Sequence, residues 1–116
     1  MNFRFAHATL LAAASAAVLL FSATAGAAVD EDAAKALAKK NDCFKCHAVD
    51  KTKKGPSYKK IAEKFKGKAD AEEKIIKNIT TGPKVKLEDG TEEDHKIIDT
   101  KDKAEIKNLI EWILSR

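Results

Sequence analysis

Sulfur is scarce in this 116-residue sequence, which contains two cysteines and a single methionine, the first residue. Histidine is scarce as well, with three copies at positions 7, 47 and 95. Beyond Met1 the chain therefore has no thioether sulfur, and it has only a few thiols and imidazoles. These absences narrow the choice of side chains that are available to bind a metal.

A large excess of one charge is also missing. The 22 Lys and Arg residues nearly balance the 18 Asp and Glu residues, and the formal net charge is +4 at neutral pH. Acidic and basic residues are interleaved along much of the chain, a pattern that is typical of a solvated surface. The balance is too even to indicate a nucleic-acid partner.

The longest apolar run lies near the amino terminus and has the features of a secretory signal. Arg4 gives a positive start, Leu10–Phe21 is apolar apart from Ser15, and Ala25-Gly26-Ala27 is an A-x-A cleavage site. The alternative is an uncleaved anchor, for which the apolar run is short. No cysteine lies at the cleavage point, which argues against a lipid anchor there. We expect residues 1–27 to be removed on export.

The expected mature chain, residues 28–116, has the size of one domain. Removal of the signal also removes Met1 and His7, so two cysteines, two histidines and no methionine remain. We expect a soluble, monomeric, periplasmic protein with no stable membrane insertion after signal cleavage. A chain of this size has a thin core, which a buried cofactor would enlarge.

Five consecutive residues, Cys43-Phe44-Lys45-Cys46-His47, carry the most specific signal in the chain. The C-x-x-C-H pattern attaches a c-type haem. Its two thiols form thioethers with the two vinyl groups on one edge of the porphyrin, and the histidine that follows supplies the proximal iron ligand. The pattern predicts one haem c, covalently bound through Cys43 and Cys46, with His47 as an axial ligand.

The same cysteines have three other interpretations: a disulfide, a thioredoxin-like redox centre, and part of a zinc site. The redox centre normally lies near a βαβ pattern, which this sequence lacks. A structural zinc site needs a fourth ligand, and only His95 or a carboxylate remains, at no usual finger spacing.

Helical periodicity predicts an all-α fold with four helices. We expect a polar residue to cap the start of each: Asp30 before Glu31–Asp42, Ser57 before a helix to Phe65, Asp70 before a helix to about Thr80, and Thr100 or Asp102 before the last. The first helix has a face of small apolar residues at Ala33, Ala34, Leu37 and Ala38. In the third, we expect Ile75, Ile76 and Ile79 to face inward.

The segment from Lys84 to Asp99 has no clean period, and we expect no strand in it. It turns at Asp89-Gly90 and carries acidic residues just before His95. A loop of this length in a small domain is usually functional or disordered, and we favour a functional loop that covers the cofactor.

These elements together resemble a small class I bacterial cytochrome c, of the short type with the haem motif near its start. The resemblance covers nearly all of residues 28–116 and includes Gly55-Pro56 and the terminal Glu111-Trp112-Ile113-Leu114-Ser115. It implies a fold in which about four helices wrap around one covalently attached haem and the first and last helices cross. It also implies that the Pro56 carbonyl accepts a hydrogen bond from His47.

The chain departs from the resemblance at the second axial ligand. Small class I cytochromes usually place a methionine sulfur there, in a proline-rich loop ahead of the last helix, and this chain has neither. His95 stands at almost the same distance before Trp112. We expect His47 and His95 to bind the iron together as a bis-histidine pair. The alternatives are an open or water-bound position and a lysine ligand from Lys84, Lys86 or Lys96.

The resemblance implies a one-electron carrier that works with redox partner proteins, and not an enzyme such as a peroxidase. Imidazole donates more strongly than thioether, so we expect a potential below that of His/Met relatives. The alternative function is a haem-based sensor or binder of a gas or small ligand, with an open or displaceable distal position.

Two groups of charged residues are candidates for tuning this activity. Lysines near the attachment motif would steer an acidic redox partner: Lys45, Lys51, Lys53 and Lys54. Acidic residues ahead of His95 would stabilise ferric iron: Glu88, Asp89, Glu92, Glu93 and Asp94. For both groups the alternative is an ordinary solvated surface.

Overall fold

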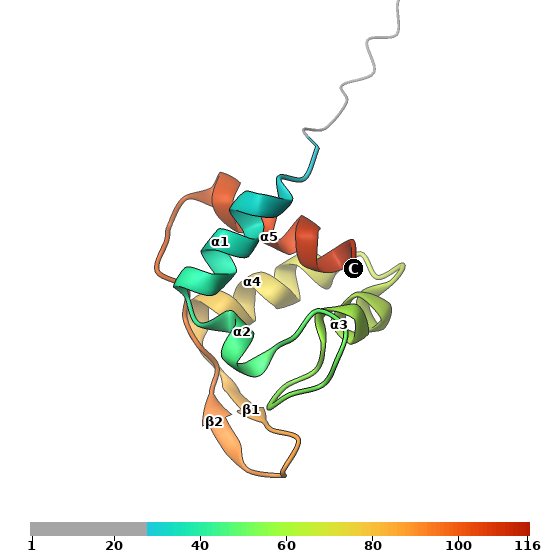
Figure 1. The fold of residues 1–116 in the computed structure, drawn as a ribbon, viewed down its shortest axis with the longest axis vertical. Helices are drawn as coiled ribbons and strands as arrows, with labels where there is room; N and C mark the ends of the chain where they lie inside the picture. The colour runs from blue at the N-terminus through green and yellow to red at the C-terminus, as the bar shows by residue number, and fades with distance from the viewer. Residues whose placement is uncertain (1–27) are drawn as a thin grey trace, which may run out of the picture.

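The computed structural model describes residues 28–116, which form five helices and one two-stranded antiparallel sheet (Figure 1). The predicted secretory signal, residues 1–27, lies outside the described residues. In chain order the elements are α1 (Glu31–Lys40), α2 (Cys43–Cys46), α3 (Tyr58–Phe65), α4 (Ala71–Thr81), β1 (Lys84–Lys86), β2 (Glu92–Asp94) and α5 (Lys103–Leu114). Among them, no helix is both long enough and apolar enough to cross a membrane.

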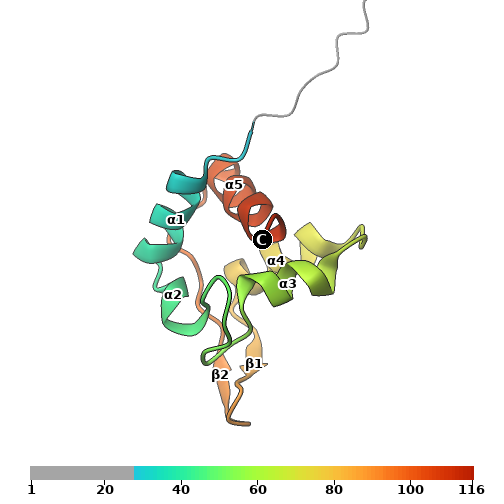
Figure 2. The same ribbon diagram turned by 45° about the vertical axis from the view of Figure 1, so that its right-hand side comes forward.

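The first and last helices cross, and their contact forms one of the two core clusters (Figure 2). Ala34 is 1% exposed and Ala38 0%, because their short side chains let α5 approach α1 closely. Trp112 of α5 belongs to the same cluster and is fully buried. The predicted crossing is therefore confirmed. Ala33, which we expected on the same face, is exposed.

A second core cluster joins α4 to α5 through Ile75, Ile79 and Ile110, with Ile98 from the segment that follows β2. Ile76 was expected to face inward and is instead 36% exposed, because α4 turns only one face of its 3.6-residue period toward the core. The second cluster therefore ties α4 and α5 to the chain segment between β2 and α5.

Three of the four predicted helix caps form as expected. The side-chain oxygens of Asp30, Ser57 and Asp102 accept hydrogen bonds from backbone N–H groups in the first turn of α1, α3 and α5. Asp70 makes no capping bond, and its carboxylate instead pairs with Lys74 at 2.7 Å. The helix it precedes, α4, still begins where the sequence indicates.

The first helix ends two residues earlier than predicted, and a separate one-turn helix, α2, follows it. Asn41 closes α1, and Asp42 adopts a left-handed conformation with φ = 58°. Aspartate tolerates this conformation better than most residues because its short polar side chain can bond locally. The break turns the chain so that Cys43 starts a new helical turn.

The segment between α4 and α5 contains β1 and β2, so the expectation of no strand was wrong. The register pairs Lys84 with Asp94 and Lys86 with Glu92, which places opposite charges across the hairpin. The turn contains Gly90 at φ = 87°. Each strand has only three residues, which is too short for a clear alternation of apolar and polar residues; β2 is fully exposed, and in β1 only Val85 is half-buried.

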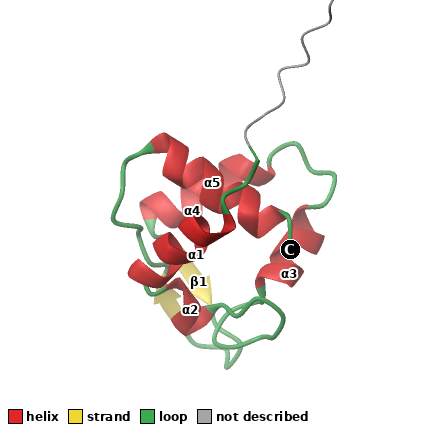
Figure 3. Ribbon diagram, turned by 45° about the horizontal axis from the view of Figure 1, so that its top comes forward, coloured by secondary structure: helices red, strands yellow, loops and turns green. Residues whose placement is uncertain are grey.

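The hairpin, α2 and the loop that follows α2 lie at the same end of the molecule (Figure 3). A backbone hydrogen bond of 3.1 Å from the Glu88 N–H to the Lys54 carbonyl joins the hairpin turn to that loop. The segments that contain His47 and His95 are therefore neighbours, although they are far apart in the sequence.

Candidate haem-binding site

Cys43 and Cys46 lie one helical turn apart in α2, so their side chains leave the helix on the same side. Both are free thiols in the structure, and both are half-buried. Burial raises the pKa of the Cys43 thiol, which keeps it protonated at neutral pH. The two cysteines therefore present a pair of thiols on one face and are not joined in a disulfide.

His47 follows α2 directly, and the Pro56 carbonyl oxygen lies 2.6 Å from its Nδ1 atom. Because a carbonyl oxygen only accepts hydrogen bonds, Nδ1 carries the proton in this contact and Nε2 keeps its lone pair. Burial lowers the pKa of His47. The ring is thus held as a neutral imidazole, which is the form that binds a metal.

The loop between α2 and α3 packs closely on the His47 ring. Gly55 is buried, and a Cβ atom at this position would lie 3.0 Å from Cε1 of His47. The Gly55 N–H also donates to the Cys46 carbonyl at 2.9 Å, which fixes the loop against α2. In the sequence, Gly55 stood out only as part of Gly55-Pro56, and this close approach was not predicted. The sequence feature that could have indicated this contact is a glycine directly before Pro56.

Aromatic side chains continue the packing from His47 to the contact between α1 and α5. The Tyr58 ring stacks on His47 with ring centres 5.4 Å apart and planes at 28°. Tyr58 meets Trp112 edge-on at 5.2 Å, and Phe44 lies edge-on to both. Burial raises the pKa of Tyr58, so its phenol stays neutral. Tyr58 lies in the helix that was predicted to follow Ser57, but helical periodicity carries no signal for stacking on a distant histidine.

His95 follows β2 and is half-buried. Its backbone N–H donates to the Pro83 carbonyl at 2.8 Å, and its Nδ1 atom lies 2.9 Å from the Lys96 carbonyl oxygen. As for His47, a carbonyl partner requires the proton on Nδ1, so in the neutral tautomer the lone pair lies on Nε2. Each histidine thus uses one ring nitrogen for a backbone carbonyl and has the other available for a metal.

The rings of His47 and His95 have their centres 6.1 Å apart and their planes at 39°. An imidazole nitrogen binds a transition-metal ion at about 2 Å, so two imidazoles on opposite sides of one ion hold their ring centres roughly 6 Å apart. The donor set of two imidazoles at this spacing, with two thiols on one face of α2, fits a c-type haem.

The structure gives less support to a zinc site and to a lysine ligand of the iron, the other ligand sets that the sequence left open. Within residues 28–116, no three His, Cys, Asp or Glu side chains gather into a metal site of the kind that zinc requires. The Lys84 amine pairs with Asp94 at 3.3 Å, and the Lys96 amine pairs with Asp42 at 3.2 Å. Lys86 lies exposed on β1.

Charged residues surround this end of the molecule. The five acidic residues ahead of His95 are all exposed, on and beside the hairpin. Two of the lysines near α2 are engaged, since Lys45 pairs with Asp42 at 3.1 Å and Lys53 donates to the Phe44 carbonyl at 2.6 Å. Lys51 and Lys54 form no ion pair within the part of the chain that the structure describes.

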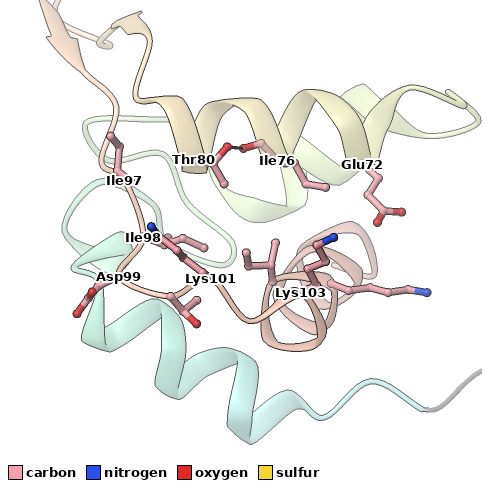
Figure 4. Close-up of a pocket in the computed structure, with 11 residues that line it drawn as sticks. Glu72, Ile76, Thr80, Ile97, Ile98, Asp99, Lys101 and Lys103 are labelled. Carbon is pink, nitrogen blue, oxygen red and sulfur yellow. Dashed lines mark hydrogen bonds between the residues drawn. The ribbon is translucent and has the colours of Figure 1, made fainter.

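A cavity of about 810 Å³ lies between α4, the segment after His95 and the start of α5 (Figure 4). Four isoleucines help to line it: Ile76, Ile97, Ile98 and Ile106. Neither histidine of the pair and neither cysteine lines it, so the cavity is not part of the candidate haem site.

Comparison with known proteins supplies the observation that decides the family. Residues 31–116, which include the attachment motif and both histidines of the pair, match the profile of the family described as cytochrome c. The chain belongs to the cytochrome c family. The predicted resemblance and the predicted single, covalently attached c-type haem are thereby confirmed.

Individual cytochromes c agree with this membership. Class 1 cytochrome MtoD from Sideroxydans lithotrophicus ES-1 has a similar crystal structure, with 63% sequence identity and a TM-score of 0.72, over 76% of this chain and 97% of that one. Cytochrome c-552 from Hydrogenobacter thermophilus is 33% identical over 79 residues, which are 68% of this chain and 76% of that protein. The predicted class I fold is therefore confirmed.

A shorter match is to cytochrome c-551 from Pseudomonas aeruginosa, which is 44% identical over 46 residues. That match spans 40% of this chain and less than half, 44%, of the Pseudomonas protein. All of these relatives are named as cytochromes, which agrees with the prediction that the protein is not an enzyme.

Proposed function

We propose that this protein carries single electrons through one haem c that is attached at Cys43 and Cys46 and bound axially by His47 and His95. The observation that carries the proposal is the pair of imidazole rings 6.1 Å apart, each with Nδ1 bonded to a backbone carbonyl. Membership of the cytochrome c family supports the role of electron carrier. When bound, the haem supplies an iron that alternates between the ferric and ferrous states.

The residues around the two histidines restrain the ligands. The Pro56 carbonyl and the close contact with Gly55 hold the His47 ring in one orientation, and the stacked Tyr58 ring limits its rotation. His95 is restrained by its backbone bond to Pro83. Ligands that are already in place have little need to move when the iron changes its oxidation state, which suits electron transfer.

The two imidazole ligands also lower the reduction potential of the haem. Axial ligands alone spread haem potentials over about 0.8 V. Imidazole donates more electron density than a thioether and so favours the ferric state. The protein therefore has a lower potential than relatives with histidine and methionine ligands.

We further propose that the protein is exported and acts in the periplasm as a soluble monomer that exchanges electrons with redox partner proteins. The support is the pattern of residues 1–27, with its positive start, apolar run and A-x-A site. The nearly even charge balance gives no support for a nucleic-acid partner.

One observation favours a second function, the binding of a gas or small ligand at the iron. His95 follows a short, exposed hairpin and does not lie on a helix, so less structure holds it than holds His47. If His95 left the iron readily, the distal position would open to exogenous ligands.

Protein matured in a host that exports and attaches c-type haem tests the proposal. We expect its mass to exceed that of the processed chain by one haem, and the gain to disappear when Cys43 and Cys46 are both replaced by alanine. We expect a six-coordinate low-spin absorption spectrum in both oxidation states. Rapid binding of carbon monoxide by the ferrous protein would favour the second function, and a colourless protein would contradict both.

A further inference from the structure

A segment without helix or strand links β2 to α5, and it begins with His95. We call residues 95–101 the distal strap. Because the distal strap has no regular hydrogen-bonded structure of its own, its position depends on bonds to neighbouring elements. Those bonds decide where the His95 ring lies.

On one side the distal strap is bonded to the end of α4 and the residues that follow it. The His95 N–H donates to the Pro83 carbonyl at 2.8 Å, and the Ile98 N–H donates to the Ile79 carbonyl at 2.9 Å. Gly82 permits this approach, since a Cβ atom there would lie 2.8 Å from the His95 carbonyl oxygen. On this side, therefore, the backbone of the distal strap lies directly against the backbone of α4 and the residues that follow it.

On the other side the distal strap is bonded to the two residues that precede α2. Asn41 Oδ1 accepts a hydrogen bond of 2.6 Å from the Asp99 N–H, and the Asp42 carboxylate pairs with Lys96 at 3.2 Å. Asn41 is only 4% exposed, and its Nδ2 donates to the Leu37 carbonyl at 2.9 Å. Both polar atoms of this buried amide are thus used, which fixes its orientation.

We propose that Asn41 is a positioning residue for the sixth iron ligand and that Asp42 assists it. These two residues lead directly into the haem-attachment helix, so their bonds to Asp99 and Lys96 tie the distal strap to the segment that carries the two thiols. The same short segment then sets the place of the attached haem and the place of His95. This proposal rests on the proposed ligation of the iron by His95.

Capture of carbon monoxide by the ferrous protein measures how often His95 leaves the iron. Carbon monoxide binds a six-coordinate iron only after a protein ligand has dissociated, so the rate at saturating gas equals the dissociation rate of that ligand. We expect Asn41→Ala to raise this rate about tenfold, the size expected when hydrogen bonds of a buried amide are lost. Stopped-flow absorption measures the rate on the intact holoprotein.

Asn108→Ala is the matched control. Asn108 also uses both amide atoms, in two 2.8 Å bonds to the Asp30 backbone that join α5 to the start of α1. Like Asn41→Ala, its replacement should lower the urea midpoint of unfolding, but it should leave the carbon monoxide rate unchanged. Equal rates in the two variants would overturn the positioning role, because global destabilisation alone would then explain the effect.

Asp42→Gly provides a second variant in case Asn41→Ala does not fold. Glycine adopts the left-handed conformation of Asp42 without strain, so the substitution removes the carboxylate together with its ion pairs to Lys96 and Lys45. Because an exposed ion pair contributes little and is screened by salt, we expect the rate to rise about twofold at low ionic strength and to stay unchanged at high ionic strength. A rate that never changes would overturn the role of Asp42.

If His95 does not bind the iron at all, the carbon monoxide rates would show a different pattern from the one that overturns the positioning role. A rate that is the same in wild type and His95→Ala, or that rises linearly with gas concentration at all levels, would show that His95 does not bind the iron. A rate that depends on His95 but is equal in Asn41→Ala and Asn108→Ala would leave the ligation intact and overturn only the positioning role.

Discussion

The carbonyl oxygen of His95 lies 2.8 Å from the point at which a Cβ atom on Gly82 would stand. Gly82 also ends α4 in a left-handed conformation, with φ = 61°. Glycine is thus required at this position for two reasons, the backbone conformation and the room that the distal strap needs. The second reason links the end of α4 to the placement of His95.

Gly82→Ala should therefore displace the distal strap as well as strain the helix end. We expect the free energy of unfolding to fall by about 2 kcal/mol or more, of which about 1 kcal/mol reflects the left-handed conformation. Urea unfolding measures the loss, and the carbon monoxide rate should rise because His95 is less well held.

Gly67→Ala is the control for Gly82→Ala. Gly67 has a similar φ of 72°, but a Cβ atom there would meet no atom within 4 Å. We expect a loss of about 1 kcal/mol from the backbone conformation alone and no change in the carbon monoxide rate. Equal losses of stability in the two variants would contradict the close approach at Gly82.

Replacing His95 by methionine should raise the reduction potential of the haem. A thioether donates less electron density than an imidazole and so stabilises the ferric state less. Redox titration followed by absorption spectroscopy measures the change, with His95→Ala as a control that removes the imidazole without supplying sulfur. An unchanged potential together with an unchanged spectrum would remove His95 from the site.

Neutralising Glu92, Glu93 and Asp94 with their amide counterparts should raise the potential at low ionic strength, because nearby negative charge favours ferric iron. The three residues differ in what they face across the hairpin. Glu92 and Asp94 face Lys86 and Lys84 across the hairpin, whereas Glu93 faces a valine. Each single amide variant should give part of the shift, because each removes one negative charge whether or not a lysine lies opposite. A shift that persists undiminished in high salt would contradict an effect of exposed charges.

The exposed lysines beside α2 should speed electron exchange with an acidic redox protein. Replacing Lys51 and Lys54 together with glutamine should slow reduction at low ionic strength, since charge complementarity mainly raises the association rate. Replacing Lys66 and Lys68, in the turn between α3 and α4, changes the net charge equally at a distance from α2. Equal slowing in the two double variants would contradict docking at the attachment side.

Several features of this protein depend on residues close together in the sequence, and these could be predicted. The spacing of Cys43 and Cys46 lies within one helical turn, and the caps at Asp30 and Ser57 act on the N–H groups of the next few residues. The small face of α1 follows from helical periodicity, although periodicity wrongly included Ala33. Interactions between residues close together in the sequence were sufficient to predict each of these features.

The features that hold His95 could not be predicted in the same way. The bond between Asn41 and Asp99 joins residues 58 positions apart, and nothing near either residue indicates the other. The hairpin before His95 has two three-residue strands with opposite charges across them and almost no apolar pattern, so its strands resembled a loop. Gly55 was noted only as part of Gly55-Pro56, and its contact with the His47 ring exists only in the folded chain.

The most direct test of the proposed iron ligation is near-infrared magnetic circular dichroism of the ferric protein, because the charge-transfer band of low-spin haem reports both axial ligands. We predict the band of two imidazole ligands for the natural chain and its loss in His95→Ala. An imidazole–amine band in the natural chain, or a bis-imidazole band that persists in His95→Ala, would contradict ligation by His47 and His95.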